Sequence, residues 1–523
     1  MTSPTTSTDR RRFLAATGAV AGLAAATSLG VSPASASSAV RREDDPFTLG
    51  IASGDPAPDG FVLWTRLAPD PFTADGGMGS AAVRVEWRVC EDEAMRREVA
   101  RGRELATPEL AHSVHVEVHG LRPDREYFYQ FRYQRGTSPV GRTRTLPAPW
   151  ACPPEMRFAF VSCQDHASGY YPSFADIAAQ DLDVVVHLGD YVYEGDVDAR
   201  GGYRDAPVPE PARAAPRTLE QWRYRYALYK SDPQLRAAHA RHPFVVTWDD
   251  HEVVNDYAGT AAAGQPDLSD LRAAAYQAYY EHQPLRRRSI PTPRGGLRLH
   301  RGFEYGTLAA FNVLDGRQYR DVPAGSWGEG PEVVDPGATM LGHRQERWLD
   351  RRLRTSRSRW NVLGNNVMVS RLDHDGPTGD VVWHDAWDGY PAARERLTRS
   401  ILDARVRNPV FITGDWHSTF VNDVHTDFDR PDSPVFATEF VGTSISSNGD
   451  REVYGPYYGP MIGYNPHIRF FDGDRRGYVR CTLTAREWRT ELRMTPTVST
   501  PDAPTETWRT FVVEDGVPGA QEV

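Results

Sequence analysis

Four short apolar runs, each followed at once by a cluster of polar residues, constrain the fold of this chain more than any other feature of its sequence. The runs are rich in valine and phenylalanine and lie at 158–161, 184–186, 244–246 and 410–412. Near-continuous apolar runs of this length are typical of parallel strands buried on both faces. Stretches with a helical pattern lie between them, at 219–229, 271–282 and 345–353. The sequence therefore predicts a layered α/β domain with its chemistry at the strand ends, where loops converge.

The polar clusters after these runs contain the residue types that bind metal ions. They are Ser162-Cys163-Gln164, Gly189-Asp190 with Tyr193-Glu194, Asp249-Asp250-His251-Glu252 with Asn255, and Gly414-Asp415-Trp416-His417. Each cluster alone is ambiguous, because a cysteine at a strand end is often a small buried hydrophobe and a Gly-Asp pair is often a turn. Together they supply a thiolate, carboxylates, a phenolate and an imidazole, all of which bind metals when deprotonated. The combination predicts a metal centre.

The residues before this domain follow a different pattern. Segments at 61–65, 83–89, 115–118 and 127–133 alternate apolar and polar residues with the period of a strand. We predict an all-β sandwich of the immunoglobulin or fibronectin type III kind over 43–147. A proline-rich stretch at 146–154 is the predicted linker. The catalytic domain is predicted over 155–495, and 496–523, rich in proline, threonine and acidic residues, is predicted to be a loose tail.

The first 36 residues have the composition of an export leader rather than of a folded segment. Arg10-Arg11-Arg12-Phe13-Leu14 precedes a mild apolar run at 15–29, and Ala34-Ser35-Ala36 supplies a small-residue cleavage pattern. The arginines followed by Phe-Leu resemble a twin-arginine signal, which predicts export through that machinery, with a free secreted form and a wall-associated form as the two alternatives. No later stretch is long and apolar enough to span a membrane.

Overall charge and cysteine content exclude some classes of protein. The net charge of -10 argues against a general nucleic-acid-binding surface or affinity for an anionic membrane. A phosphate site on such an acidic chain needs local positive charge, from metal ions or arginines. Four cysteines in 523 residues do not make a disulfide framework. Cys90 and Cys152 could pair outside the cell, or these two and Cys481 could be single thiols.

The motif Gly189-Asp190-x-x-Tyr193 resembles the calcineurin-like metallophosphoesterases, in particular the purple acid phosphatase branch with its iron-bound tyrosine. The first-strand Asp-x-His of that branch is replaced here by Ser162-Cys163-Gln164. Its Gly-Asn-His-Glu is replaced by Asp249-Asp250-His251-Glu252, and its Gly-His-x-His by Gly414-Asp415-Trp416-His417. These replacements are similar to those of the PhoD-like alkaline phosphatases and phosphodiesterases. Further matches lie at 53–56, 314–320, 340–342, 387–390, 439–447 and 465–467, so the resemblance covers nearly the whole mature chain.

The resemblance implies a four-layer αββα metallophosphoesterase domain that carries iron and calcium. Thiolate, phenolate and imidazole ligands favour iron, whereas oxygen-rich sites favour calcium, magnesium or manganese. We therefore expect Fe³⁺ to be held by Cys163, Asp190, Tyr193 and His417. Asp190 is expected to bridge to a Ca²⁺ that Asp250 and Asp415 also hold. A second Ca²⁺ is implied nearby, with Asn255, Asp249 and Asp388 as candidate ligands.

The family also implies attack on a bound phosphate ester by a metal-bound hydroxide or oxide. His251 occupies the position of the family's proton donor or phosphate contact, and the alternative is a hydrogen-bond donor behind the ligands. Arg317 could make a forked contact to phosphate or a structural ion pair with a nearby aspartate. The expected substrate is a small phosphate mono- or diester, hydrolysed at alkaline pH.

Three other readings stay open on the sequence. The same fold could act on phospholipids, as a phospholipase D-like enzyme, or on wall teichoic acids as a phosphodiesterase. A serine-nucleophile alkaline phosphatase would need histidine-rich zinc ligation, which Ser162 lacks. A non-catalytic calcium-binding adhesion protein would not need a thiolate, a phenolate and a histidine beside its carboxylates. The preference between monoesters and diesters and the oligomeric state are not predicted.

Overall fold

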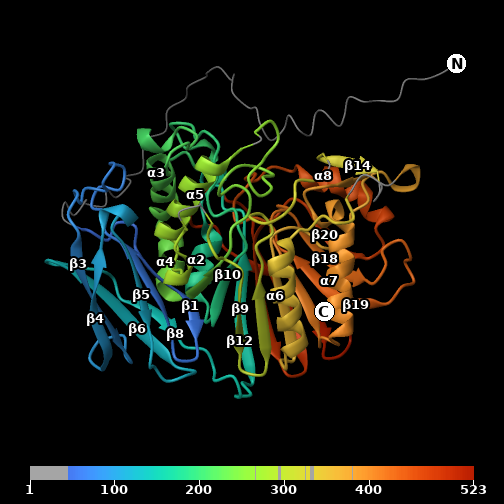
Figure 1. The fold of residues 1–523 in the computed structure, drawn as a ribbon, viewed down its shortest axis with the longest axis horizontal. Helices are drawn as coiled ribbons and strands as arrows, with labels where there is room; N and C mark the ends of the chain where they lie inside the picture. Colours follow the sequence, from blue (N-terminus) through green and yellow to red (C-terminus); the bar gives the residue numbers. More distant parts are fainter. Residues whose placement is uncertain (1–44, 266, 293–295, 324, 330–334, 380) are drawn as a thin grey trace. The chain divides into compact units, whose positions relative to one another are not determined.

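The computed structural model describes residues 45–523 apart from 266, 293–295, 324, 330–334 and 380. The export leader predicted at 1–36 lies outside the described residues. Two large mixed sheets dominate the fold, with helices in two separate groups (Figure 1). The four apolar runs predicted as buried strands lie in β9, β10, β11 and β17, so this prediction is confirmed.

The larger sheet has ten strands. Their order across the sheet is β24-β23-β22-β21-β9-β10-β11-β1-β2-β5, and β9, β10, β11 and β1 run parallel to one another. The strands are β1 (Ile51–Ala57), β2 (Gly60–Arg66), β5 (Ser113–Val118), β9 (Glu155–Val161), β10 (Val184–His187), β11 (Pro243–Val246), β21 (Arg476–Thr484), β22 (Glu487–Thr495), β23 (Glu506–Glu514) and β24 (Gln521–Glu522).

The second large sheet has seven strands in the order β12-β13-β15-β17-β19-β18-β20, with β13, β15, β17 and β19 parallel. The strands are β12 (Arg301–Tyr305), β13 (Ala309–Val313), β15 (Trp360–Asn365), β17 (Pro409–Thr413), β18 (Thr419–His425), β19 (Val435–Val441) and β20 (Ile468–Asp472). A small two-stranded sheet pairs β14 (Trp327–Glu329) with β16 (Val381–Trp383).

Three hydrophobic cores hold these elements together. One core joins the two large sheets, with Phe158 and Val186 of the first against Phe311 and Val410 of the second. The helices α2 (Pro172–Ala179), α3 (Leu219–Lys230), α4 (Pro233–Arg241) and α5 (Ser269–His282) contribute to a core on the larger sheet. The helices α6 (Gly342–Thr355) and α7 (Pro391–Asp403) contribute to a core on the smaller one. A short helix, α8 (Tyr454–Tyr458), packs in a separate cluster.

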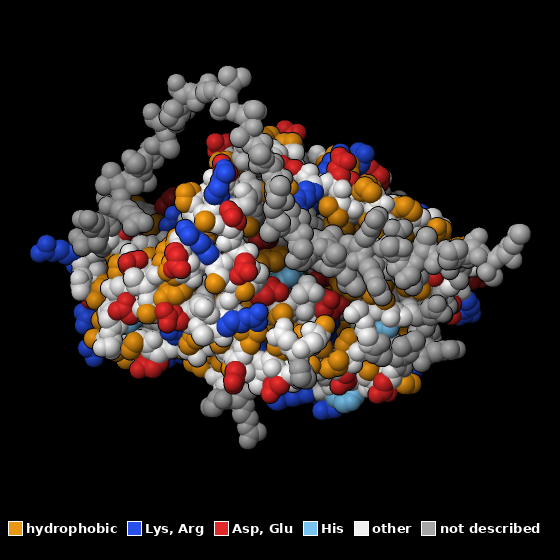
Figure 2. Space-filling view, turned by 90° about the horizontal axis from the view of Figure 1, so that it is seen from above, with side chains coloured by type: hydrophobic (Ala, Val, Ile, Leu, Met, Phe, Trp, Pro, Cys, Tyr) orange, Lys and Arg blue, Asp and Glu red, His pale blue; other side chains and the backbone are white. Residues whose placement is uncertain are grey.

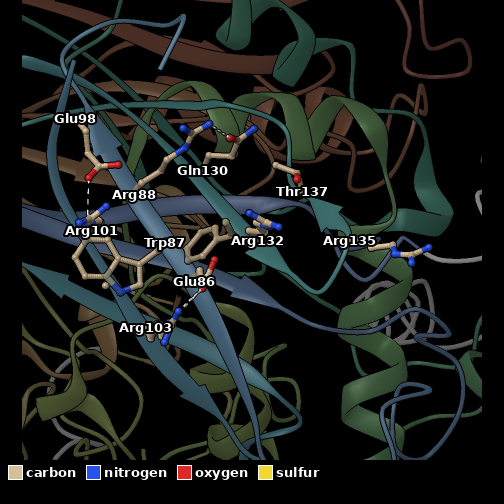
Figure 3. Close-up of a pocket in the computed structure, with 12 residues that line it drawn as sticks. Glu86, Trp87, Arg88, Glu98, Arg101, Arg103, Gln130, Arg132, Arg135 and Thr137 are labelled. Carbon is tan, nitrogen blue, oxygen red and sulfur yellow. Dashed lines mark hydrogen bonds and ion pairs between the residues drawn. The ribbon is translucent and has the colours of Figure 1, made fainter. Parts of the chain in front are cut away.

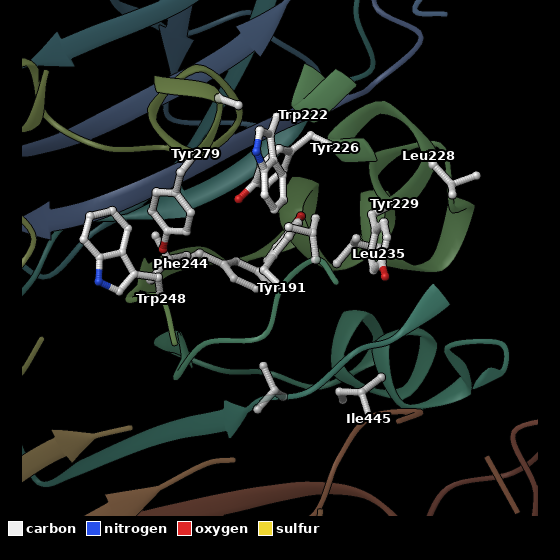
Figure 4. Close-up of a cluster of buried hydrophobic side chains, with 14 of the residues drawn as sticks. Tyr191, Trp222, Tyr226, Leu228, Tyr229, Leu235, Phe244, Trp248, Tyr279 and Ile445 are labelled. Carbon is white, nitrogen blue, oxygen red and sulfur yellow. The ribbon is translucent and has the colours of Figure 1, made fainter. Parts of the chain in front are cut away.

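The helices predicted at 219–229, 271–282 and 345–353 lie within α3, α5 and α6. Helix α3 begins at a complete capping box, in which Thr218 accepts from the backbone N–H of Gln221 and the Gln221 side chain reaches back. The hydrophobic core that α3 shares with α2, α4 and α5 is rich in aromatic residues. It includes Tyr191 and Trp248 (Figure 4). Each of these two residues is adjacent in sequence to an aspartate of the predicted metal centre. The loops that carry these aspartates are thus anchored by large buried rings.

The N-terminal segment forms a sandwich, but not a separate one. One of its sheets contains β3 (Val83–Cys90), β4 (Glu98–Ala106), β6 (Glu126–Tyr133), β7 (Gly136–Thr137) and β8 (Gly141–Arg144). The facing strands β1, β2 and β5 are the edge of the ten-stranded sheet, because β1 pairs in parallel with β11. The sandwich predicted over 43–147 is present, but three of its strands also belong to the ten-stranded sheet, which the sequence did not predict. A Cβ at Gly54 would lie 2.6 Å from the Phe244 oxygen, so the pairing depends on a glycine rather than on an apolar pattern.

The loose tail predicted over 496–523 is wrong. Residues 506–514 form β23, which pairs antiparallel with β22, and Phe511 and Val513 are buried between the sheets. The segment has a polar composition because β23 is near the edge of the sheet and its first half is largely exposed, with Glu506, Thr507 and Arg509 on the surface.

No helix within the described residues is long and apolar enough to cross a membrane. All four cysteines are free thiols, so of the two alternatives for Cys90 and Cys152 the structure has the unpaired one.

Candidate metal centre

The carboxyl ends of the parallel strands bring the four predicted clusters together. Cys163 follows β9, Asp190 follows β10, the Asp249-Asp250-His251 segment follows β11, and Asp415 and His417 follow β17. Loops from both large sheets thus meet at one place, because the two sheets pack face to face through a shared core.

The first group contains the residues predicted to hold iron. The Cys163 sulfur, an Asp190 oxygen and a His417 nitrogen lie within 4.8 Å of one another. The Tyr193 hydroxyl donates to Asp190 Oδ2 at 2.9 Å and lies 3.1 Å from His417 Nε2. Ser447 donates to the same hydroxyl at 2.7 Å. All four predicted ligands therefore converge on one small volume.

The second group is made of carboxylates. Oxygens of Asp249, Asp250 and Asp415 lie within 4.8 Å of one another, and Asp190, Asp250 and His251 form a further group with the same spacing. Because Asp190 belongs to the thiol-containing group and to the group with Asp250, it links the two clusters. This is the position that a bridging ligand would have.

Burial makes an anionic cluster of this kind unstable without cations. It raises the pKa of the Cys163 thiol and of the Asp190 and Asp415 carboxyls well above their usual values, and neighbouring carboxylates add to this effect. Burial lowers the pKa of His417 to about 3, so its ring is neutral and able to bind a metal. Asp190 Oδ1, Asp249 Oδ2 and Asp415 Oδ2 are buried and form no hydrogen bond within the described part of the chain. Orphaned acceptors in a buried acidic cluster fit bound cations.

The backbone at this site is held in a conformation that most residues avoid. Cys163, Asp190, Asp415 and His417 have φ of 59°, 57°, 67° and 50°. Left-handed conformations of non-glycine residues cost about 1–3 kcal/mol each and concentrate at functional sites. Gly189 has φ 117°, and a Cβ there would lie 2.4 Å from the Asp249 Cβ. The loops after β10 and β11 can therefore approach each other only because residue 189 is glycine.

Arg317 lies inside the carboxylate group and is fully buried. Its Nε donates to Asp249, its Nη1 donates to Asp385 at 2.7 Å, and its Nη2 lies 3.7 Å from Asp250 and 3.6 Å from Asp415. Of the two roles considered from the sequence, this geometry supports the structural ion pair. Burial alone would raise the pKa of Asp250, but the Arg317 charge helps to hold that pKa below its usual range.

His251 lies at the side of the cluster and is partly exposed. Its Nδ1 lies 2.7 Å from Glu194 Oε2, and its ring stacks on Tyr193 with centroids 4.2 Å apart. The Asn255 backbone N–H donates to the other Glu194 oxygen at 2.9 Å. Burial disfavours the charged ring, but Glu194 and Asp190 together hold the pKa of His251 well above its usual value. The contact between Nδ1 and Glu194 fixes the orientation of the His251 ring, so Nε2 is the ring nitrogen that can contact a ligand.

The candidates for a second calcium ion do not all lie together. Asp249 is in the carboxylate group, whereas Asn255 is an exposed residue. Asp388 accepts from the Leu372 backbone N–H at 2.8 Å and from Arg394 at 2.5 Å, so both of its oxygens have structural partners. The structure therefore assigns Asp388 a structural role and not a place in the cluster.

Comparison with known proteins identifies the family. The PhoD-like phosphatase family model matches residues 158–492, and the model of the N-terminal domain of PhoD-like phosphatases matches residues 32–147. The chain belongs to the PhoD-like phosphatase family. It is 44% identical over 527 residues to alkaline phosphatase D of Bacillus subtilis (strain 168), covering 98% of this chain and 89% of the relative. A solved structure described as that of PhoD has a TM-score of 0.86 at 44% identity and covers 91% of this chain and 92% of the other. As a member of this family, the protein is a hydrolase of phosphoric ester bonds.

Several residues of this PhoD-like site were missed on the sequence. Glu252 accepts from the backbone N–H groups of Asp190 and Asp249, at 3.1 and 2.8 Å, and so ties two metal-centre loops together. Its position next to His251 in the third cluster was the available signal. Asp385 accepts from Arg317 and Arg320. It lies two residues before the family match at 387–390, which does not include it.

Asn366 is the other missed residue, and it joins strand ends of both sheets. Its side chain donates to the backbone oxygens of Leu188 and Trp248 and accepts from the Gly316 N–H at 2.8 Å. It follows β15, whose run is interrupted by Asn361 and Gly364 and therefore did not read as a buried strand.

Proposed function

We propose that this PhoD-like phosphatase is a secreted, metal-dependent alkaline phosphatase that uses iron and calcium to hydrolyse small phosphate esters. The single observation that carries the proposal is the convergence of Cys163, Asp190, Tyr193 and His417 beside a group of three aspartates. The 44% identity to a protein named alkaline phosphatase D supports the same activity here.

Cys163, Tyr193 and His417 would hold the iron, because a thiolate, a phenolate and a neutral imidazole prefer such a metal to calcium. Asp250 and Asp415 would hold calcium through oxygen atoms alone. Asp190 would contribute to both ions. When bound, the cations would supply Lewis acidity toward the attacking oxygen and neutralise the charge of the phosphate.

The chain's own residues prepare this site. Arg317 fixes Asp249 and stands beside Asp250 and Asp415, so it limits repulsion among the carboxylates. Glu252 fixes the loops that carry Asp190 and Asp249. His251 is proposed to give a proton from Nε2 to the departing ester oxygen, with Glu194 orienting its ring through Nδ1. Arg317 is thus proposed as a positioning residue and His251 as the catalytic one.

The finer architecture and the export route are part of the proposal. The core between the two sheets and the helical cores on their outer faces support a four-layer αββα arrangement. The arginine pair and cleavage pattern in the first 36 residues support export through the twin-arginine machinery.

Release of p-nitrophenol from its phosphate monoester and from its bis-ester, at alkaline pH, tests the activity. Turnover should stop on chelation and return with calcium. Asp415→Asn should lower kcat by about 100-fold or more, because it removes a proposed ligand. The matched control Asp432→Asn changes an exposed aspartate and should leave turnover unchanged. Full turnover in chelated protein, or in Asp415→Asn, would reject metal-dependent hydrolysis at this site.

A further inference from the structure

A cavity apart from the metal centre lies beside the N-terminal half of α6. It is a cavity of about 420 Å³ whose lining includes three arginines, two histidines and two aromatic residues, and no carboxylate among the described residues. The residues that matter for the argument are Arg298, His300, Tyr319, Arg344, Trp348 and Arg351. In a chain with a net charge of -10, a cavity lined only by cationic, aromatic and neutral residues is unusual.

The three arginines are not engaged by acidic partners. Within the described residues, Arg298, Arg344 and Arg351 have no carboxylate at ion-pair distance. The pocket on β3, β4 and β6 is also rich in arginine, but its lining includes Glu86 and Glu98 (Figure 3). There Arg103 pairs with Glu86 at 2.8 Å and Arg101 with Glu98 at 3.5 Å. Unpaired guanidinium groups around a cavity favour an anionic ligand. On the face drawn in Figure 2, acidic and basic side chains lie interspersed.

His300 provides a second, independent indication of a ligand. Its side chain lines the cavity and is only 7% exposed, and its Nδ1 is buried with no hydrogen-bond partner in the described part of the chain. The ring contacts Trp348 and Tyr319, with centroids 5.1 and 5.9 Å away. A buried polar nitrogen without a partner is costly, and an oxygen of a bound anion could satisfy it.

The helix end adds to the positive potential. Helix α6 has 14 residues, its N-cap Leu341 has no capping side chain, and its first turn contains no acidic residue. Of the first-turn N–H groups, that of Gly342 is satisfied by Thr339 at 2.8 Å. The start of a helix carries a partial positive charge, and anions are stabilised there.

We propose that this cavity is a second binding site for a phosphate group, separate from the metal centre. The ligand is a phosphate dianion, either free or carried by an organic molecule, held by Arg298, Arg344 and Arg351 with His300 beside it. The site is linked to the metal centre through Gln345, which also lines the cavity. Gln345 accepts from the Asp315 N–H at 3.0 Å and donates to the Asp315 oxygen at 2.8 Å. Asp315 in turn accepts from the Arg317 N–H at 3.2 Å.

Isothermal titration of the holoenzyme with inorganic phosphate tests the proposal. The wild-type protein should bind phosphate at two sites. Arg344→Glu should lose one of them, with affinity at that site at least about tenfold weaker because a charge-assisted contact becomes a repulsive one. Arg347→Glu is the matched control, since it reverses an exposed charge on the same helix outside the cavity, and it should keep both sites.

Two further titrations are needed. The first distinguishes a failure of this proposal from a failure of the proposed hydrolytic function, and the second identifies the source of the phosphate. Asp415→Asn, which alters the metal centre, should keep the cavity site, so a failure of phosphatase activity leaves this test intact. Phenylphosphonate, whose P–C bond is not an ester, is the second probe. Tighter binding of phenylphosphonate than of inorganic phosphate would assign an organic phosphate, and the reverse would assign free phosphate. Phosphate binding that is the same in the wild type and in Arg344→Glu, whether at one site or at two, would overturn the proposal.

Discussion

Gly189→Ala tests whether the metal centre depends on the close approach of two strand-end loops. The added Cβ would lie 2.4 Å from the Asp249 Cβ and 2.5 Å from the Asp249 nitrogen. Ordinary carbon–carbon contact begins near about 3.5 Å, so the loops after β10 and β11 must separate by about 1 Å. Asp190 and Asp249 would move apart by a similar amount.

The magnitude of the effect follows from this displacement and from the backbone. A misplacement of about 1 Å at a catalytic site can lower turnover by about 100-fold. The φ of 117° adds a conformational cost for alanine, and with the overlap the variant should lose about 3 kcal/mol of unfolding free energy. Activity should fall more than stability alone explains, because the change acts directly on the ligand spacing.

The assay compares Gly189→Ala with Gly195→Ala. Gly195 lies in the same loop, is exposed, has no positive φ, and a Cβ there would meet nothing within 4 Å. Turnover of p-nitrophenyl phosphate, metal content and urea unfolding are measured on both. Gly195→Ala should behave as the wild type. Wild-type turnover and metal content in Gly189→Ala would refute the reasoning, because the loops would then tolerate separation.

Three other predictions concern single side chains. His251→Ala should lower kcat by roughly 100-fold on an alkyl phosphate and much less on p-nitrophenyl phosphate, whose leaving group needs little protonation; equal losses on both substrates would exclude proton donation. Tyr193→Phe should remove the visible absorption of a ferric tyrosinate, and an unchanged spectrum would place Tyr193 outside the iron site. Burial lowers the pKa of Lys230 to about 7, below its unfolded value of 10.5, although its ammonium lies over the Trp64 ring. Burying the charged Lys230 ammonium lowers the unfolding free energy by its full amount below pH 7, and this cost disappears as pH rises toward 10.5 and the amine becomes neutral in both states. Lys230→Met should therefore add about 3 kcal/mol of unfolding free energy at pH 6 and none at pH 11. Equal gains in urea unfolding at both pH values would contradict this.

The parallel strands and the clusters that follow them could be predicted because both leave a signal in the side chains. Strands β9, β10, β11 and β17 are short apolar runs, and the residues after each run are metal-binding types. Strand ends at one edge of a sheet lie close together, so the approach of Cys163 to Asp190, which follow the neighbouring strands β9 and β10, followed from local patterns. The approach of His417 did not, because it follows β17 of the other sheet and depends on how the two sheets pack.

The continuity of the N-terminal strands with the catalytic sheet could not be predicted in this way. Strand β1 joins β11 through backbone hydrogen bonds, and Gly54 contributes the absence of a side chain rather than an apolar one. Strand β23 is half exposed and near a sheet edge, so its composition resembles that of a loop. Sheet edges are specified by pairing partners far away in the chain, which a local pattern does not contain.

Residues that position the ligands were also beyond the sequence pattern. Asn366 and Asp385 act through contacts with loops 50 or more residues away, and neither lies in a recognisable cluster. The two roles of Arg317 could be compared only in the structure, where the guanidinium is buried and is paired with Asp249 through Nε and with Asp385 through Nη1.

Elemental analysis of the purified, exported protein tests the central claim most directly. The wild type should contain iron and calcium. Cys163→Ser should lose the iron, whereas the matched control Cys481→Ser, at another buried free thiol, should keep it. Zinc alone in the wild type, or full iron content in Cys163→Ser, would contradict the proposed metal centre.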